Sequence, residues 1–436
     1  MKIQRGPATV IRDVFSPCES LIYVAYVRTK LGRPGKTVDL KVRRPASISV
    51  LAIFERKIWR IIMSFCYTPS LSECGFFLLP KNHGGQLEDL AEQYNVAPNK
   101  IIDFSVNVNP LGLPDSLVNI LQENIAFLSR YPDPESRFLC RKLAHTLDLL
   151  PEQILVGNGC SELIYLLGRF FQPVNTLIVQ PTFSEYERSI LIAGGHVKHY
   201  LLSPETNFQC KLDLLIQEAS NMQMLFLCNP NNPTGHLMSG YDIIKLVSAL
   251  PQTLVVIDES FLDFVEETDS HSLIKKTSLF PNLIVLRSMT KIFAIPGLRL
   301  GYLVANSDLV KHLNRVKEPW NVNYLAQIAG EHLIDLDDYI RRTRDLIRAE
   351  KTFLFNELSQ FKWLSPYPTD ANFFLVQIKH SDITAGILNE KLIHQGIYVR
   401  DCSNFVGLNG QFFRIAIKKH LENEKLIASL QEIGEY

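Results

Sequence analysis

One short run of the sequence brings together a lysine, two hydroxyl residues and an arginine. Lys291 follows Ser288 and Thr290 closely, and Arg299 comes eight positions after the lysine. An amine at the end of a buried strand loses part of its hydration, which favours the neutral, nucleophilic form that a Schiff base requires. Hydroxyl and guanidinium groups are good ligands for a phosphate beside that amine. We therefore predict that Lys291 is catalytic, although a lone lysine is more often an exposed loop residue.

Two further motifs, suited to an anion and to a flat ring, follow predicted strands. The turn Gly157-Asn-Gly-Cys-Ser-Glu162 precedes a helix, whose first N–H groups at Cys160 and Ser161 would bind an anion. A tight turn without a ligand is the alternative. Phe183 would stack on a flat ring, or else be a core aromatic residue. Each motif is weak alone, so the prediction depends on their occurring together.

An asparagine-rich loop and a carboxylate complete the set. The loop Asn229-Pro-Asn-Asn-Pro-Thr-Gly235 is stiffened by two Asn-Pro pairs and would hold the Asn232 amide against a ring substituent. Asp258 follows four apolar residues, so we expect it to be buried and to need a cationic partner such as a protonated pyridine nitrogen. A helix N-cap is the alternative for this residue. Together with Lys291, these residues predict a pocket for pyridoxal 5′-phosphate (PLP) and no metal site.

The elements that must position these residues alternate regularly. Apolar runs of strand type are separated by segments long enough for a helix, which predicts an α/β fold with a mostly parallel sheet buried on both faces. Such sheets bind ligands at the carboxyl ends of their strands, where the candidate residues fall. The expected strands are residues 177–180, 224–228, 254–257, 283–286 and 302–304. A helical stretch is expected over residues 322–358, followed by a smaller α+β domain with strands at 373–378, 397–399 and 412–417.

The first 80 residues differ from the rest of the chain. They contain thirteen Lys and Arg residues against five acidic ones, without a sustained helical or strand period. Three interpretations are open: an accessory segment, a nucleic-acid-binding appendage, and upstream sequence translated ahead of a true start near Met63. We favour the last, because the segment lacks a consistent pattern. The expected domains are a basic N-terminal extension (1–80), an N-terminal arm with part of the small domain (81–130), a large PLP-binding domain (131–323) and a C-terminal small domain (324–436).

The overall composition narrows the class of protein. Of 436 residues, 46% are hydrophobic and 21% are charged, which describes a folded globular protein. The 45 basic and 45 acidic residues balance, so nothing global indicates a nucleic-acid or membrane partner. The eight cysteines lack CxxC spacing, which favours reduced thiols in the cytoplasm over a metal site or disulfide framework. No apolar run approaches the ~20 residues of a membrane span.

Three motifs carry a resemblance to a known superfamily. The segments around Asn232, Asp258 and Lys291 resemble the fold-type I PLP enzymes of the aminotransferase class I/II superfamily, over residues 81–436. The resemblance implies that Lys291 forms the Schiff base with PLP, that Asp258 pairs with the pyridine nitrogen and that Asn232 bonds the ring 3-oxygen. Phe183 would stack on the ring. The implied phosphate ligands are Cys160, Ser161, Ser288 and Arg299, with Tyr131 from the neighbouring subunit.

Within this superfamily, the chain resembles the branch of threonine-phosphate decarboxylases. The resemblance lies in His83-Gly-Gly-Gln86 (with Gln in place of the usual Asn), in residues 103–112, and in Phe261, where most of the superfamily has a tyrosine whose hydroxyl reaches the ring 3-oxygen. It implies decarboxylation of L-threonine O-3-phosphate to (R)-1-aminopropan-2-yl phosphate, for cobalamin biosynthesis, by a cytoplasmic homodimer. The implied substrate ligands are Arg414 for the α-carboxylate, and Arg400, His83, Gly84 and Asn232.

Two alternatives stay open. A histidinol-phosphate or related aminotransferase would differ in which bond of the substrate stands perpendicular to the ring, and residue identity does not determine that angle. A regulator with an aminotransferase-like domain would use residues 1–80 to contact DNA. It would need a recognition helix, and Pro34, Gly35 and Pro45 interrupt the region where one would lie.

Overall fold

The structure is a computed structural model that describes residues 9–10, 26–27, 84–85 and 87–434. The chain divides into two units, residues 1–78 and 79–436. In the first unit the described residues form two short antiparallel strands, β1 Thr9–Val10 and β2 Tyr26–Val27. The rest of the predicted extension at 1–80 lies outside the described residues, so its interpretation stays a prediction.

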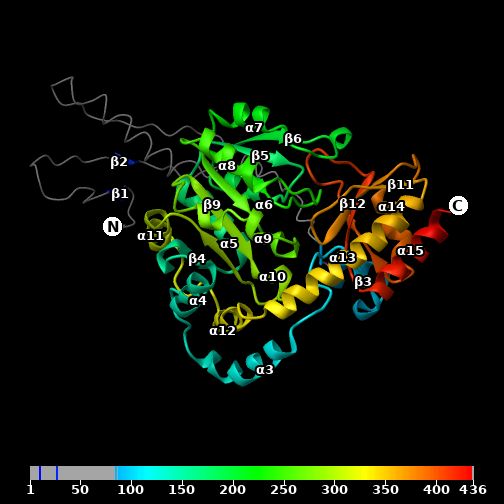
Figure 1. Ribbon diagram of the computed structural model, residues 1–436, viewed down its shortest axis with the longest axis horizontal. Coiled ribbons are helices and arrows are strands. Elements are labelled where there is room, and N and C mark those ends of the chain that lie inside the picture. The colour runs from blue at the N-terminus through cyan, green and yellow to red at the C-terminus, as the bar shows by residue number, and fades with distance from the viewer. Residues whose placement is uncertain (1–8, 11–25, 28–83, 86, 435–436) are drawn as a thin grey trace, which may run out of the picture. The chain divides into compact units, whose positions relative to one another are not determined.

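A seven-stranded sheet forms the centre of the second unit (Figure 1). Its order is β4-β10-β9-β8-β7-β5-β6, and neighbours run parallel except β10, which is antiparallel to both β4 and β9. The predicted strands are all present, and the prediction of a mostly parallel sheet is confirmed. The strands are β4 Ile154–Gly157, β5 Asn175–Gln180, β6 His196–Leu201, β7 Met224–Cys228, β8 Leu254–Asp258, β9 Leu283–Ser288 and β10 Gly301–Val304.

Helices cover both faces of this sheet because its central strands are apolar on both sides. Along β8, Val256 belongs to one apolar cluster, whereas Val255 and Ile257 belong to another. This is the result of successive side chains pointing to opposite faces of a strand. Helices α5, α6 and α11 pack in the first cluster, and α4, α7, α8 and α12 in the second. These helices are α4 Arg137–Leu147, α5 Gly159–Phe171, α6 Glu185–Ile192, α7 Leu212–Ala219, α8 Gly240–Ala249, α11 Ser307–Val316 and α12 Tyr324–Leu333.

A second sheet of four antiparallel strands, in the order β11-β12-β15-β14, lies toward the C-terminus (Figure 1). The strand predicted at 397–399 is present as β13, which pairs in parallel with β3, and a further strand, β14, follows it and joins the four-stranded sheet. The segment before the large domain is therefore tied to the C-terminal part of the chain. The bounds are β3 Ile102–Asp103, β11 Leu364–Pro366, β12 Phe373–Ile378, α14 Ala385–Ile393, β13 Ile397–Tyr398, β14 Arg400–Asp401, β15 Phe412–Ala416 and α15 His420–Gly434.

The helical stretch predicted over residues 322–358 is present, but it is divided into two helices. The structure has α12 followed by a separate helix, α13 Asp337–Gln360. Asp337 and Asp338 lie in the first turn of α13, and carboxylates there stabilise a helix N-terminus, which explains a second start at this point. Within residues 87–434, no helix is long and apolar enough to cross a membrane. The remaining helices are α2 Leu87–Tyr94, α3 Asp115–Asn124, α9 Thr268–His271 and α10 Met289–Ile292.

Asn109 fixes the short helix α10, which follows β9 and carries Lys291. The backbone N–H of Asn109 donates to the Lys291 carbonyl at 2.9 Å. Its side-chain Nδ2 donates to the Ile292 carbonyl at 2.7 Å and to the Thr343 hydroxyl of α13 at 2.6 Å. Asn109 is buried, so these bonds are made away from water. The segment after β3 thus joins α10 to α13, and the position of Lys291 depends on it.

We expect Asn109→Ala to lower the free energy of unfolding by about 1–3 kcal/mol, because buried hydrogen-bonding groups lose their partner. Urea unfolding of the purified protein measures this. The control is Asn356→Ala, since Asn356 lies on α13 with its side chain exposed. Equal midpoints for the two variants would contradict a bracing role for Asn109.

Candidate functional site

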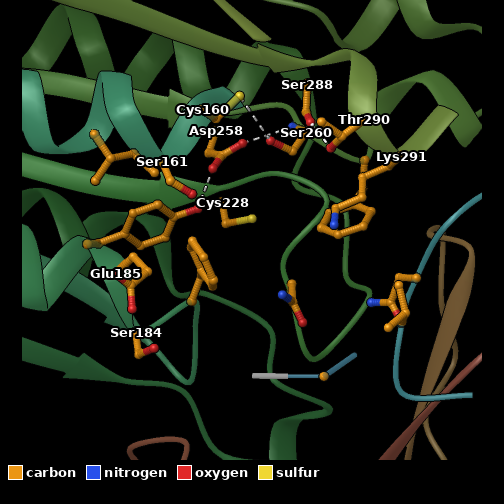
Figure 2. Close-up of a pocket in the computed structure, with 18 of the residues that line it drawn as sticks. Cys160, Ser161, Ser184, Glu185, Cys228, Asp258, Ser260, Ser288, Thr290 and Lys291 are labelled. Carbon is orange, nitrogen blue, oxygen red and sulfur yellow. Dashed lines mark hydrogen bonds between the residues drawn. The ribbon is translucent and has the colours of Figure 1, made fainter. Parts of the chain in front are cut away.

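The polar residues at the carboxyl ends of β7, β8 and β9 line one pocket of about 420 Å³ (Figure 2). Figure 2 shows Asp258, Ser260 and Ser288 gathered at one end of this pocket, with Lys291 beside them. The sequence-predicted residues that line it are Gly84, Cys160, Ser161, Phe183, Asn232, Asp258, Ser288, Lys291, Arg299, Arg400 and Arg414.

Two predicted site residues are not among the residues that line this pocket. Tyr131 is 81% exposed and packs against Trp320, with ring centroids 4.9 Å apart. Tyr131 was expected to contribute to the site of the neighbouring subunit. Its exposure agrees with that role, which stays a prediction. His83 lies outside the described residues.

Lys291 is the nucleophilic amine of the pocket. It lies in α10, directly after the buried strand β9. Its pKa is lowered to about 8, mainly by burial and also by the positive charges of Arg414 and Arg299. A much larger neutral fraction is therefore present near pH 7 than for an ordinary lysine, whose pKa is about 10.4. This is the form that attacks an aldehyde.

Asp258, the last residue of β8, is a buried carboxylate, only 4% exposed. Its Oδ1 accepts a hydrogen bond from the Ser260 backbone N–H at 2.9 Å, and its Oδ2 accepts one from the Tyr186 hydroxyl at 2.6 Å. Burial raises the pKa of Asp258, while these hydrogen bonds and the charge of Lys291 act in the opposite direction. An ionised carboxylate held in this way suits a cationic ring nitrogen.

The N-terminus of α5 forms an anion cradle with Arg299. Gly159 has a φ of +75°, and a Cβ there would lie 2.4 Å from the guanidinium Nη2 of Arg299. The absence of a side chain therefore lets the guanidinium reach the first turn of the helix, where free N–H groups and the helix dipole favour an anion. The Ser288 and Thr290 hydroxyls, 2.7 Å apart, line the same pocket.

The Cys160 thiol in this first turn is neutral. Its Sγ donates to the Arg287 carbonyl at 3.1 Å, and its pKa is raised to about 12, mainly by burial. The thiol therefore adds no charge to the cradle, and an anion bound there meets the helix dipole and Arg299.

Two arginines from the small sheet face each other in the pocket. The register of β14 and β15 pairs Arg400 directly with Arg414, so both side chains project from the same face. Arg414 donates to the Ser105 carbonyl at 2.6 Å and to Oδ1 of Asn232. Burial lowers the pKa of both, and the charge of Arg400 contributes to the value of about 10 for Arg414. Like charges opposite each other repel, so the arrangement suits a ligand with two anionic groups.

Arg400 is held on three sides. It donates to the Asp401 carbonyl at 2.6 Å and to Oδ1 of Asn404 at 2.8 Å. Its guanidinium carbon lies 5.2 Å from the ring centre of Phe405, a cation–π distance. The guanidinium is therefore ordered before any ligand arrives.

The aromatic side chains of the pocket separate into two groups. The Phe183 ring meets the edge of Tyr186 at a centroid distance of 5.7 Å and an angle of 83°. Phe261 packs on Phe373 at 5.0 Å and presents no hydroxyl to the pocket. The one tyrosine hydroxyl that bonds Asp258 among the described residues thus comes from α6, not from the segment after β8.

The sequence interpretation missed several residues of the pocket. Ser105 and Asn107 alternate with Phe104, Val106 and Val108, and this period of two marks a segment with one polar face. Within the described part of the chain, Oδ1 of Asn107 is buried without a hydrogen-bond partner. That alternation was a usable signal for Asn107. The other missed residues include Tyr186, Ser260 and Asn404.

The residues present fit PLP. The α5 cradle with Arg299 suits its phosphate, Phe183 its ring face, Asp258 its ring nitrogen, Asn232 its 3-oxygen and Lys291 its aldehyde. Gly159 supports this fit, because a side chain there would displace the end of the Arg299 guanidinium from the cradle.

Known proteins resemble this chain in sequence and in structure. The chain is 34% identical to the threonine-phosphate decarboxylase of Salmonella typhimurium over 356 residues, which cover 80% of this chain and 96% of that protein. The crystal structure of L-threonine-O-3-phosphate decarboxylase from Porphyromonas gingivalis matches with a TM-score of 0.71 and 29% identity, covering 76% of this chain and 98% of the other.

The histidinol-phosphate aminotransferase of Clostridium acetobutylicum is equally close in structure. Its TM-score is 0.71 at 30% identity, covering 76% of this chain and 98% of that one. The predicted α/β architecture of fold-type I enzymes is confirmed by these neighbours. The model of the family "Aminotransferase class I and II" matches residues 99–430. The chain belongs to the aminotransferase class I and II family.

Proposed function

We propose that the chain is a PLP-dependent decarboxylase that converts L-threonine O-3-phosphate into CO₂ and (R)-1-aminopropan-2-yl phosphate, for cobalamin biosynthesis. The observation that carries the proposal is the buried pair Arg400 and Arg414, which lines the same pocket as Lys291 and Asp258. Threonine phosphate has the two anionic groups that such a pair needs, a carboxylate and a phosphate. The similarity to the Salmonella and Porphyromonas proteins supports the same substrate.

In this proposal PLP, when bound, supplies an electron sink for the negative charge that remains on Cα after a bond to it breaks. Lys291 would hold the cofactor and later move a proton, because its pKa of about 8 leaves part of the amine neutral near physiological pH. Asp258 pairs with the ring nitrogen, and Phe183 covers one ring face. The ligands for the cofactor phosphate are Cys160, Ser161, Ser288 and Arg299, joined by Tyr131 of a second copy.

The substrate is held at both anionic ends. Arg414 binds the α-carboxylate, and Arg400 binds the phosphate with His83 and Gly84. Asn107 also lines the pocket, and its buried Oδ1 is an acceptor without a donor among the described residues, so it would face a donor group of the ligand and not an anionic end. Fixing both ends would set the torsion about Cα and so determine which bond to Cα is held ready to break. Lys291 or water then returns a proton to Cα.

A second candidate activity is histidinol-phosphate transamination. It is supported by the Clostridium aminotransferase, whose TM-score equals that of the Porphyromonas decarboxylase. Transamination requires the Cα–H bond to stand perpendicular to the ring, and it requires a keto-acid acceptor. The two activities can therefore be distinguished, because only decarboxylation releases CO₂ and only transamination requires a keto-acid acceptor.

We expect the PLP-loaded protein to release CO₂ from L-threonine O-3-phosphate in the absence of any keto acid. Gas-phase or coupled CO₂ detection with mass spectrometry of the aminopropanol phosphate measures this. L-Threonine is the control substrate, and we expect at least ~10-fold lower kcat/KM because it lacks the charge-assisted bonds to Arg400. Acceptor-dependent transamination of histidinol phosphate without CO₂ release from threonine phosphate would overturn the decarboxylase assignment.

We expect the attachment of PLP to the apoprotein to accelerate with rising pH and to level off above pH ~8. The neutral amine of Lys291 is the nucleophile, and its pKa is lowered to about 8. Borohydride trapping with absorbance spectroscopy measures the rate, and Lys291→Ala should give no trapped adduct. The control is Lys351→Ala, since Lys351 is another lysine whose pKa burial lowers, and it does not line the pocket. An adduct in Lys291→Ala would show that another lysine carries the cofactor.

We also propose that the protein is a homodimer in the cytoplasm. An exposed apolar surface lies at the short 3₁₀ segment that follows α3. Its side chains are Ile125, Phe127, Leu128 and Tyr131, together with Trp320, whose ring packs against Tyr131. An apolar surface of this kind is typical of an interface, and Tyr131 lies on it. In this proposal, the partner subunit's Tyr131 would contribute to binding the cofactor phosphate. Five free cysteines among the described residues favour a reducing compartment.

We expect light scattering to show a dimer, and Leu128→Lys to shift it toward monomer with loss of activity. A mixture of Lys291→Ala and Tyr131→Ala variants, refolded or exchanged together, should regain activity. Each mixed dimer then contains one site with both an intact Lys291 and an intact Tyr131. Tyr241→Ala, which removes another exposed tyrosine, is the control for Tyr131. Failure of the mixture to exceed the sum of the separate variants would contradict a shared site.

A further inference from the structure

The Tyr186 side chain connects the stacking ring to the buried carboxylate. It lies in α6 and is 1% exposed, and its hydroxyl donates to Oδ2 of Asp258 at 2.6 Å. Its ring stacks on Phe226 at 5.0 Å and 11°, and its edge meets Phe183. Packing on two sides therefore determines where the hydroxyl points, and it points at Asp258.

The charge of Asp258 depends on a small set of neighbours. Burial raises its pKa, whereas the hydrogen bonds from Ser260 and Tyr186 and the charge of Lys291 act to lower it. The titratable groups that interact with it are Tyr186, Lys291, Cys160 and Cys228. Burial also raises the pKa of both thiols and of Tyr186, so these three stay protonated near neutral pH. Tyr186 is then a permanent donor, and Lys291 is the one neighbour whose charge changes near neutral pH.

We propose that Tyr186 is a positioning residue that keeps Asp258 ionised and oriented toward the ring nitrogen of PLP. The inference rests on the proposed function, since it requires PLP in this pocket. A donor to Oδ2 stabilises the charged carboxylate and leaves the protonated form without an equivalent partner. The Ser260 N–H holds the other oxygen, so the two donors together fix the plane of the carboxylate. Through its contact with Phe183, the same side chain links the ring-nitrogen contact to the ring-stacking contact.

Tyr165 is a matched control for Tyr186. Its hydroxyl donates to Oε2 of Glu185 at 2.5 Å, so it is also a tyrosine bonded to a carboxylate of the α5–α6 pair. Its hydroxyl bonds Glu185 and not Asp258, and Tyr165 itself does not line the pocket, although Glu185 does. Tyr165→Phe and Tyr186→Phe each remove one oxygen from such a bond and keep the aromatic ring.

The test is the affinity for PLP of the full-length protein, measured by equilibrium dialysis and fluorescence quenching between pH 6 and 9. We expect Tyr186→Phe to weaken binding about tenfold, as for the loss of one hydrogen bond to a charged group. The pKa of Asp258 rises when its donor is lost, so a higher pH is needed to ionise it. The pH below which PLP binding weakens should therefore move upward in Tyr186→Phe and stay at the wild-type position in Tyr165→Phe.

A double-mutant cycle with Asp258→Asn separates this role from general packing. If Tyr186 acts through Asp258, adding Tyr186→Phe to Asp258→Asn changes the PLP affinity little, whereas a packing defect adds its full loss. Additive losses, or a Tyr186→Phe variant with wild-type affinity and pH profile, would overturn the inference while leaving the proposed function intact. Failure of the wild-type protein to bind PLP would remove both. Thermal unfolding of the apoproteins checks that all variants are folded.

Discussion

The repulsion among positive charges gathered in one pocket is the constraint on which the rest of this structure depends. Lys291, Arg299, Arg400 and Arg414 line one pocket, and the carboxylates that line it among the described residues are Asp258 and Glu185. Charges of one sign interact more strongly away from water, and each also loses hydration. The lowered pKa values of Lys291 and Arg414 are a direct consequence. The positive charge of such a site is balanced only when anions bind in it. The proposed cofactor and substrate both carry anionic groups.

The arginines of the site are oriented in part by backbone carbonyls. Arg299, Arg400 and Arg414 each donate to a backbone carbonyl, at 3.2, 2.6 and 2.6 Å. A carbonyl dipole orients a guanidinium but leaves its net charge for a ligand. Arg287, one residue before Ser288, is different: it forms ion pairs with Glu259 at 3.3 Å and with Asp263 at 2.7 Å. The choice of partner separates the arginine that stabilises the fold from those that can bind a ligand.

Sequence patterns predicted the parts of the structure that depend on local order. Apolar runs predicted the strands. The position of Asp258 after four apolar residues predicted a buried carboxylate at the end of β8. Both predictions succeed because strand ends and burial depend on residues close together in the chain. Contacts set by sheet register or by distant packing were not predicted. Tyr186 reaches a residue 72 positions away, and Arg400 faces Arg414 only because β14 pairs with β15 in one register. The start of α13 was missed because its apolar spacing continues that of α12 across the break.

The pairing of β14 with β15 also bears on which bond the enzyme breaks. Arg400 and Arg414 come from paired positions on adjacent strands, so the separation of their Cα atoms is set by the ladder, at about 4.5–5.5 Å, and not by a mobile loop. A substrate whose carboxylate and phosphate lie on neighbouring carbons can satisfy both guanidinium groups at once. A substrate without a carboxylate would leave Arg414 buried and unpaired, which is costly. Under the proposed function, the rigid pair therefore selects a compact dianion and fixes its Cα torsion in the same contact.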